Sequence, residues 1–190
     1  MKDMFCFQCQ QTAHNTGCEG KAGVCGKKAD TANYQDEIIG ALIGLSRAAK
    51  DGNPTEKTDA LMEKALFTTI TNVNFNDTMI REIISEVQQE KQRISRGEHP
   101  DYDMKKLWDG DENIRSLKSL VLFGLKGMAA YAYHARVLRH TCREVDEFFY
   151  EALFQIGEEG SQESLLPLVL KTGNINLKCL ELLDHANTQT

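Results

Sequence analysis

The sequence predicts an all-α protein made of two three-helix bundles in series, with a cysteine-rich loop at the N-terminus. Three observations lead to this prediction. From about Ala32 onward, apolar residues recur at intervals of three and four, which is the helical period. No alternating pattern of useful β-strand length appears. Four of the six cysteines lie between Cys6 and Cys25, in a segment poor in aliphatic side chains.

Composition narrows the class of protein and its partners. A chain of 190 residues with 41% hydrophobic content can bury a substantial core. The net charge of −6 argues against nucleic acid as a partner, because phosphate binding needs a clustered basic face. No stretch approaches the roughly 20 apolar residues of a membrane span, and residues 1–7 lack the features of a secretory signal. We therefore expect a cytoplasmic protein that binds neither nucleic acid nor membrane.

Residues 1–30 form the predicted cysteine-rich loop. Four glycines punctuate this segment, at positions 17, 20, 23 and 26. Glycine adopts backbone conformations closed to other residues, so the segment is expected to be a wound loop. It contains too little apolar mass to fold alone. Packing against the rest of the chain, or a metal centre whose binding releases folding free energy, must hold it in place.

Residues 31–96 form the predicted first bundle. The helical period begins at about Ala32 and stops at the turn signal of residues 51–54, Asp-Gly-Asn-Pro. A second helix is expected from near Thr55 to Thr71. A third is expected from Asp77, a residue suited to an N-cap, to about Arg96.

Residues 97–113 have the composition of a linker. They contain one Pro, two Gly and six acidic residues, which are more typical of a connection than of a core. We therefore predict a boundary between the two bundles in this segment.

Residues 114–190 form the predicted second bundle. A long helix is expected over residues 117–138, because apolar residues recur through it with the helical period. Another helix is expected over 144–156. Two short helices, 161–172 and 174–186, are expected to be separated at Gly173, with Asn174 capping the second.

The cysteine spacing, Cys6-x2-Cys9-x8-Cys18-x6-Cys25, predicts a single centre held by four thiolates. Structural zinc uses the same donors, but its common signature is two tight pairs, and only the first pair here is tight. A disulfide or redox switch would leave two of the cysteines unexplained. An iron–sulfur cluster tolerates unequal loop lengths, and nearby glycines let backbone N–H groups approach its sulfides. Spacing alone favours the cluster and leaves the other two open.

Several separated blocks of the sequence resemble the hybrid-cluster protein family, also called prismane proteins or hydroxylamine reductases. The first three blocks surround the cysteines, and the last two lie in the helical part. They read Met4-Phe-Cys-Phe-Gln-Cys-Gln-Gln-Thr-Ala13, Asn15-Thr-Gly-Cys18, Gly23-Val-Cys-Gly-Lys27, Thr68-Thr-Ile-Thr-Asn-Val-Asn-Phe75 and Gly124-Leu-Lys-Gly-Met-Ala-Ala-Tyr-Ala-Tyr-His-Ala-Arg136. The resemblance covers essentially the whole chain and corresponds to the family's helical first domain.

The resemblance implies a cluster on Cys6, Cys9, Cys18 and Cys25. Members with eight residues between the second and third cysteine usually carry a [4Fe-4S] cluster, whereas those with longer gaps tend to carry [2Fe-2S]. The family's catalytic hybrid cluster is held by residues of two later domains, and no residue up to Thr190 matches those ligands. The hybrid cluster is therefore expected only in a full-length parent. The isolated chain is not expected to reduce hydroxylamine.

Two hypotheses of function follow. The first is an electron-transfer domain that receives electrons from a redox donor protein and passes them to the hybrid cluster in the parent's other domains. The second is a structural interaction domain in which zinc or a cluster only fastens residues 1–30 to the bundles.

Outside the cysteine-rich loop, Cys142 and Cys179 are expected to fill core. His134 and His140 are six residues apart and make a poor metal pair.

Overall fold

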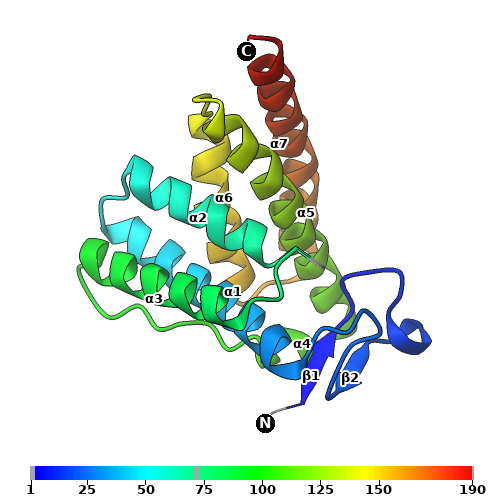
Figure 1. The fold of residues 1–190 in the computed structure, drawn as a ribbon. Helices are drawn as coiled ribbons and strands as arrows, with labels where there is room; N and C mark the ends of the chain where they lie inside the picture. The colour runs from blue at the N-terminus through cyan, green and yellow to red at the C-terminus, as the bar shows by residue number, and fades with distance from the viewer. Residues whose placement is uncertain (1–2, 71–72, 190) are drawn as a thin grey trace.

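The computed structural model describes residues 3–70 and 73–189, and this part of the chain is dominated by α-helices (Figure 1). The predicted all-α class is confirmed. The N-terminal segment adds a two-stranded antiparallel sheet and one short 3-10 helix. The elements in order are β1 Met4–Cys6, η1 Ala13–Asn15, β2 Cys18–Gly20, α1 Ala29–Asp51, α2 Glu56–Thr68, α3 Asp77–Ile94, α4 Lys105–Trp108, α5 Glu112–Val137, α6 Arg143–Gly157 and α7 Gln162–Thr188.

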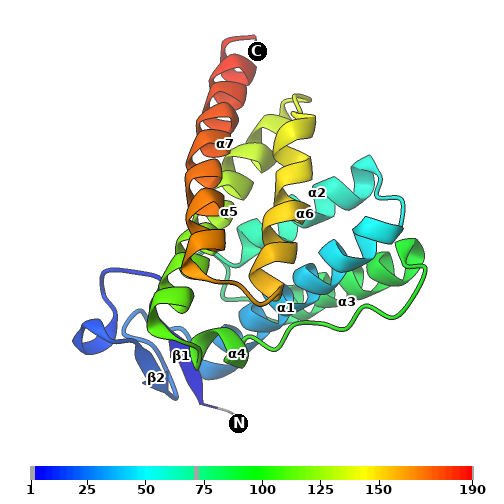
Figure 2. The ribbon, with the colours of Figure 1, turned by 180° about the vertical axis from the view of Figure 1, so that it is seen from behind.

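The helices of the two predicted bundles share one hydrophobic core. Long α5 and α7 lie side by side, and α1 runs beside α3 (Figures 1 and 2). Across the two groups, α1 packs against α6 and α2 packs against α5. One continuous cluster of buried apolar residues therefore extends from Ile38 in α1 to Cys179 in α7. The cysteine-bearing hairpin lies at one corner of this body, beside α4.

Polar side chains at the helix starts explain where several helices begin. The Asn76 side chain accepts hydrogen bonds from the backbone N–H groups of Thr78 and Met79, at 3.1 and 3.2 Å, and so caps α3. The prediction of Asp77 as this cap is wrong by one residue. Asp77 is the first helical residue, and its carboxylate instead accepts a 2.6 Å bond from Thr31 of α1. The predicted end of the second helix, Thr71, lies outside the described residues.

The C-terminal helix α7 is continuous, so the predicted break at Gly173 and the predicted cap at Asn174 are wrong. Buried residues before and after this point, Thr172, Ile175 and Cys179, keep one face of α7 in the core. Because their burial depends on an unbroken helical period, packing outweighs the weak helix propensity of one glycine.

Gly40 and Gly173 allow a matched test of this balance. A Cβ added to Gly173 meets nothing within 4 Å, so Gly173→Ala should raise the free energy of unfolding by about 0.5–1 kcal/mol through helix propensity. A Cβ on Gly40 of α1 would collide with the carbonyl oxygen of Tyr102. Gly40→Ala should therefore lower the free energy of unfolding by about 1–3 kcal/mol. Urea unfolding followed by circular dichroism measures both, and equal effects would contradict the packing.

The predicted linker of residues 97–113 contributes to the core. Met104, Leu107 and Trp108 are buried, the last two within α4. The backbone N–H of Tyr102 donates a 3.1 Å hydrogen bond to the carbonyl of Gly40, so the segment runs directly along α1. The expectation that this segment stays out of the core is wrong. Its acidic residues face outward while every few positions an apolar side chain turns inward.

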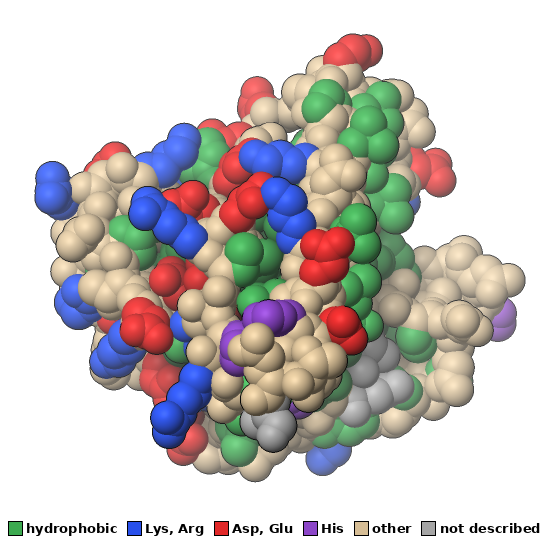
Figure 3. Space-filling model, turned by 90° about the horizontal axis from the view of Figure 1, so that it is seen from above, with side chains coloured by type: hydrophobic (Ala, Val, Ile, Leu, Met, Phe, Trp, Pro, Cys, Tyr) green, Lys and Arg blue, Asp and Glu red, His purple; other side chains and the backbone are tan. Residues whose placement is uncertain are grey.

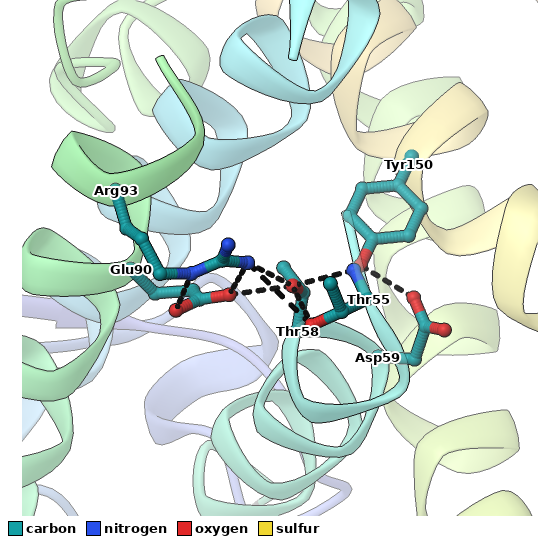
Figure 4. Close-up of polar contacts among 6 residues, drawn as sticks. All are labelled: Thr55, Thr58, Asp59, Glu90, Arg93 and Tyr150. Atoms are coloured by element: carbon teal, nitrogen blue, oxygen red, sulfur yellow. Dashed lines mark hydrogen bonds and ion pairs between the residues drawn. The ribbon is translucent and has the colours of Figure 1, made fainter. Parts of the chain in front are cut away.

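A polar network fixes the start of α2 against α3 (Figure 4). Glu90 is buried, and its carboxylate accepts hydrogen bonds from Thr58 at 2.5 Å and from Arg93 at 2.7 Å. The Arg93 bond, followed by that of Thr58, lowers the pKa of Glu90 although burial opposes it. Thr55 and Thr58 complete a capping box at the N-terminus of α2. The buried carboxylate is thus fully partnered.

A second network joins α2, α5 and α6. The Arg136 guanidinium of α5 donates to Glu63 of α2 at 2.7 Å and to Asp146 of α6 at 3.0 Å. Glu63 is almost completely buried, and burial raises the pKa of Asp146. Nearby, the Tyr150 hydroxyl donates to Asp59 at 2.7 Å (Figure 4). One cation therefore holds two carboxylates from different helices.

The surface is mixed in character. In the view from above, acidic and basic side chains are interspersed over one part of the face, and hydrophobic side chains gather in a band beside them (Figure 3). On α7 the large exposed apolar side chains are Leu166, Leu170, Leu177 and Leu180. Within residues 3–70 and 73–189, no helix combines the length and apolar content needed to cross a membrane.

Candidate metal centre

The short hairpin places two of the four predicted ligands opposite each other. β1 pairs antiparallel with β2 in the register Met4 to Gly20, Phe5 to Glu19 and Cys6 to Cys18. Residues directly opposite in such a pair lie on the same face, with Cβ atoms about 4.5–5.5 Å apart. Cys6 and Cys18 therefore present their thiols on one face of the hairpin.

The third ligand lies beside Cys18. A Cβ built on Gly23 would lie 3.6 Å from the Cys25 sulfur and 3.7 Å from the Cys18 Cβ, so both cysteines border this glycine. The Gly26 N–H donates to the carbonyl of Gly23 at 2.9 Å and closes the turn that carries Cys25. Gly26 has φ +83°, a conformation that favours glycine.

Thr12 connects the fourth predicted ligand, Cys9, to the hairpin. The Thr12 backbone N–H donates to the carbonyl of Cys9, and its side-chain hydroxyl donates to the carbonyl of Cys6, both at 3.2 Å. Thr12 is therefore hydrogen-bonded to the backbone of both Cys6 and Cys9.

The donor set suits a soft metal centre. All four cysteines are free thiols, and Cys18 is buried. Hydrogen bonds from the backbone of Val24 and then Ala13 lower the pKa of Cys18, and the charge of Lys27 adds to this effect, while burial opposes it. A lower thiol pKa favours the thiolate, which is the form that ligates metal. The chemistry of the residues present thus fits an iron–sulfur cluster.

Convergence of the four sulfurs on a single point stays a prediction. In the described ranges 3–70 and 73–189, no group of three or more His, Cys, Asp or Glu side chains is arranged to hold one metal ion. The contacts above relate Cys6 to Cys18 and Cys25 to Cys18, and they relate Cys9 to Cys6 through the backbone.

Aromatic packing docks the cysteine-bearing segment onto the helices. The Phe7 ring lies 5.5 Å from that of Trp108 in α4 and 5.6 Å from that of Phe123 in α5. The Phe5 ring lies 5.4 Å from Phe7. Gly17 lies against Phe5, where a Cβ would come within 2.5 Å of the ring. Sequence reasoning missed Trp108 and Phe123, although a lone tryptophan in an acidic segment was a usable signal.

Two buried lysines belong to the cysteine-bearing segment or contact it. Lys27 is only 1% exposed and donates to the side chain of Gln35 at 2.7 Å. Lys126 of α5 is 5% exposed and donates to the Gln8 side chain at 3.1 Å and to the Thr69 carbonyl at 3.3 Å. Sequence reasoning assigned no role to either lysine, since buried lysines cannot be recognised without knowing what covers them.

Cys142, Cys179, His134 and His140 belong to the helical part of the chain, whereas His14 lies in η1, between Cys9 and Cys18. Cys179 is fully buried in α7, and burial raises the pKa of its thiol to about 12. Cys142 is the N-cap residue of α6 and packs, partly buried, against the main core. His134 packs on Phe67, whereas His140 packs on His185.

Fold and site together define a class of protein: an all-α domain whose N-terminal hairpin carries closely placed free cysteines. A family model described as Prismane/CO dehydrogenase family matches residues 4–190. The chain therefore belongs to the Prismane/CO dehydrogenase family, whose prismane members bind iron–sulfur clusters.

Curated relatives support the same assignment. The chain is 37% identical to a hydroxylamine reductase of Nitratidesulfovibrio vulgaris, with 98% of this chain and 40% of the relative covered. It is 38% identical to hydroxylamine reductases of Halothermothrix orenii and Methanocella arvoryzae, with 97% and 98% of this chain covered and 40% of each relative. The chain thus spans about 40% of the length of these relatives.

Proposed function

We propose that the chain is an iron–sulfur electron-transfer domain of a hydroxylamine reductase-like parent, with a [4Fe-4S] cluster on Cys6, Cys9, Cys18 and Cys25. The observation that carries the proposal is the pairing of Cys6 with Cys18 across the hairpin, with Cys25 beside Cys18. When bound, such a cluster accepts and releases one electron.

The chain's own residues would fix the ligands and limit their access to water. The hairpin register sets the separation of Cys6 and Cys18. Phe5 and Phe7 provide an apolar layer beside the first ligand and join it to α4 and α5. Burial and hydrogen bonding around sulfur are the means by which a protein tunes such a cluster.

The electron acceptor in this proposal is the hybrid cluster of domains that this chain does not include. The names and greater lengths of the relatives support a parent that is an oxidoreductase acting on hydroxylamine. The proposed partners are a redox donor protein and those further domains, in the cytoplasm. The isolated chain would carry electrons without reducing hydroxylamine itself.

The second candidate is a structural role, in which zinc or a cluster only fastens the N-terminal segment. The small size of the local core favours it, because the buried apolar cluster there consists of Met4, Cys18, Ala29 and Ala32 alone among the described residues. A metal centre would add folding free energy that this cluster cannot supply.

Anaerobic purification followed by metal and acid-labile sulfide analysis tests the proposal. We expect a brown protein with about four iron and four sulfide per chain, which bleaches on reduction by dithionite. Two of each would replace [4Fe-4S] by the [2Fe-2S] alternative. A colourless protein with one zinc would overturn the proposal, and a cluster that resists reduction would favour the structural role.

A further inference from the structure

Two buried lysines, Lys27 and Lys126, lie next to the cysteine-bearing segment or within it, and no carboxylate of residues 3–70 and 73–189 forms an ion pair with them. The hydrogen-bond acceptors of Lys27 and Lys126 are amide and carbonyl oxygens, and neither lysine forms an ion pair with any of the described residues. Lysine is almost never fully buried unless paired, because removing an ammonium group from water is energetically costly. The two charges therefore need a compensating negative group.

The nearby carboxylate does not balance them. Asp36 accepts a 3.0 Å hydrogen bond from the Trp108 indole, and burial raises its pKa to about 6. Burial also lowers the pKa of Lys126 to about 8, with the charge of Asp36 opposing this. Two cations against one carboxylate leave a surplus of positive charge.

This surplus faces the thiols. Lys126 holds the side chain of Gln8, which lies between Cys6 and Cys9 in the sequence, and it interacts electrostatically with Cys6. Lys27 lies two residues after Cys25, and its charge lowers the pKa of Cys18. An iron–sulfur centre with four thiolate ligands is anionic, and each added electron makes it more so. Its negative charge would compensate the positive charges of the two lysines.

We propose that Lys126, together with Lys27, is the built-in countercharge of the thiolate-ligated centre and raises its reduction potential. Lys126 is thus a positioning and tuning residue, which acts through its charge and through its hydrogen bond to Gln8. This inference rests on the proposed function and concerns how readily the centre takes up its electron.

Lys118 provides a matched control on the same helix. It is also 5% exposed, and its ammonium donates to the carbonyls of Ile156 and Glu158 at 2.8 and 2.6 Å. Eight residues separate it from Lys126, about 12 Å along the helix axis. Lys118→Met therefore removes a buried lysine charge whose hydrogen-bond partners lie at the end of α6 and not in the cysteine-bearing segment.

The experiment is an anaerobic redox titration of the loaded 190-residue chain, followed by electron paramagnetic resonance. Lys126→Gln and Lys126→Met should both lower the reduced-to-oxidised ratio at a fixed potential by roughly tenfold, a shift of about 59 mV for one electron. Lys118→Met should leave it unchanged. If Lys126→Gln, which keeps a donor for Gln8, behaves like the wild type, the charge is irrelevant and the inference fails.

A second measurement serves if the Lys126 variants do not retain iron. In the full chain freed of iron by a chelator, Lys126→Met should raise Tm, because it removes an uncompensated buried charge. A lower Tm would overturn the inference, since it would show that the lysine is only a structural tether. A wild-type chain without iron would refute the proposed function and this inference together. Equal potentials in loaded proteins would refute this inference alone.

Discussion

Replacing Cys18 with alanine should strip the anaerobically purified chain of its iron and acid-labile sulfide. Cys18 is buried, lies opposite Cys6 in the hairpin and borders the same glycine as Cys25, so it is the residue that relates Cys6 to Cys25. Its lowered pKa also favours the thiolate form. Iron content should fall from about four per chain to near zero, because a cluster with three thiolates is readily lost.

Cys142→Ala is the control for this prediction. Cys142 precedes α6 and is partly buried against the main core, away from the hairpin. Its removal should leave iron and sulfide contents as in the wild type. Circular dichroism of both variants shows whether the helices persist. Equal iron content in the Cys18 and Cys142 variants would contradict the ligand assignment.

Arg136→Met should lower the free energy of unfolding by about 3–5 kcal/mol. Arg136 is the cation shared by Glu63 and Asp146, and its loss leaves a nearly fully buried carboxylate without a counterion. The hydrogen bond with Glu63 is the main cause of the raised pKa of Arg136, so the guanidinium stays charged at any working pH. Urea unfolding of the isolated chain measures the effect.

Arg143→Met is the matched comparison. Arg143 forms a 2.6 Å ion pair with Glu147 on the surface of α6, and its side chain is 90% exposed. Exposed pairs of this kind contribute about 0.2–1 kcal/mol. A loss from Arg143→Met as large as that from Arg136→Met would show that burial of the Arg136 network does not govern its energetics.

The helices could be predicted from the sequence because their signal is local. Apolar residues of α1, α3 and α6 recur at the helical period, and the structure confirms helices at these positions. Gly173 misled the prediction because its local propensity is weak, whereas burial of Thr172 and Ile175 involves α5, a distant part of the chain. Trp108 was missed for the same reason, since its partners Phe5, Phe7 and Asp36 are remote in sequence.

The candidate site likewise has a part that could be predicted from the sequence and a part that could not. Cysteine spacing is a one-dimensional signal, so Cys6, Cys9, Cys18 and Cys25 could be named from the sequence alone. Some of the groups near them come from elsewhere: Lys126 and Phe123 lie on α5, more than a hundred residues after their partners Gln8 and Phe7. No local pattern predicts a contact over such a separation.

The hairpin register has a consequence for how the cysteine spacing can change. Because Cys6 faces Cys18 through strand pairing, a slip of one residue would turn one of the two thiols to the opposite face. The connection between the strands, which includes Cys9 and the short 3-10 helix, carries no such restriction. Insertions between Cys9 and Cys18 can therefore be absorbed as a larger bulge at the surface, whereas a single insertion within either strand would misplace a ligand.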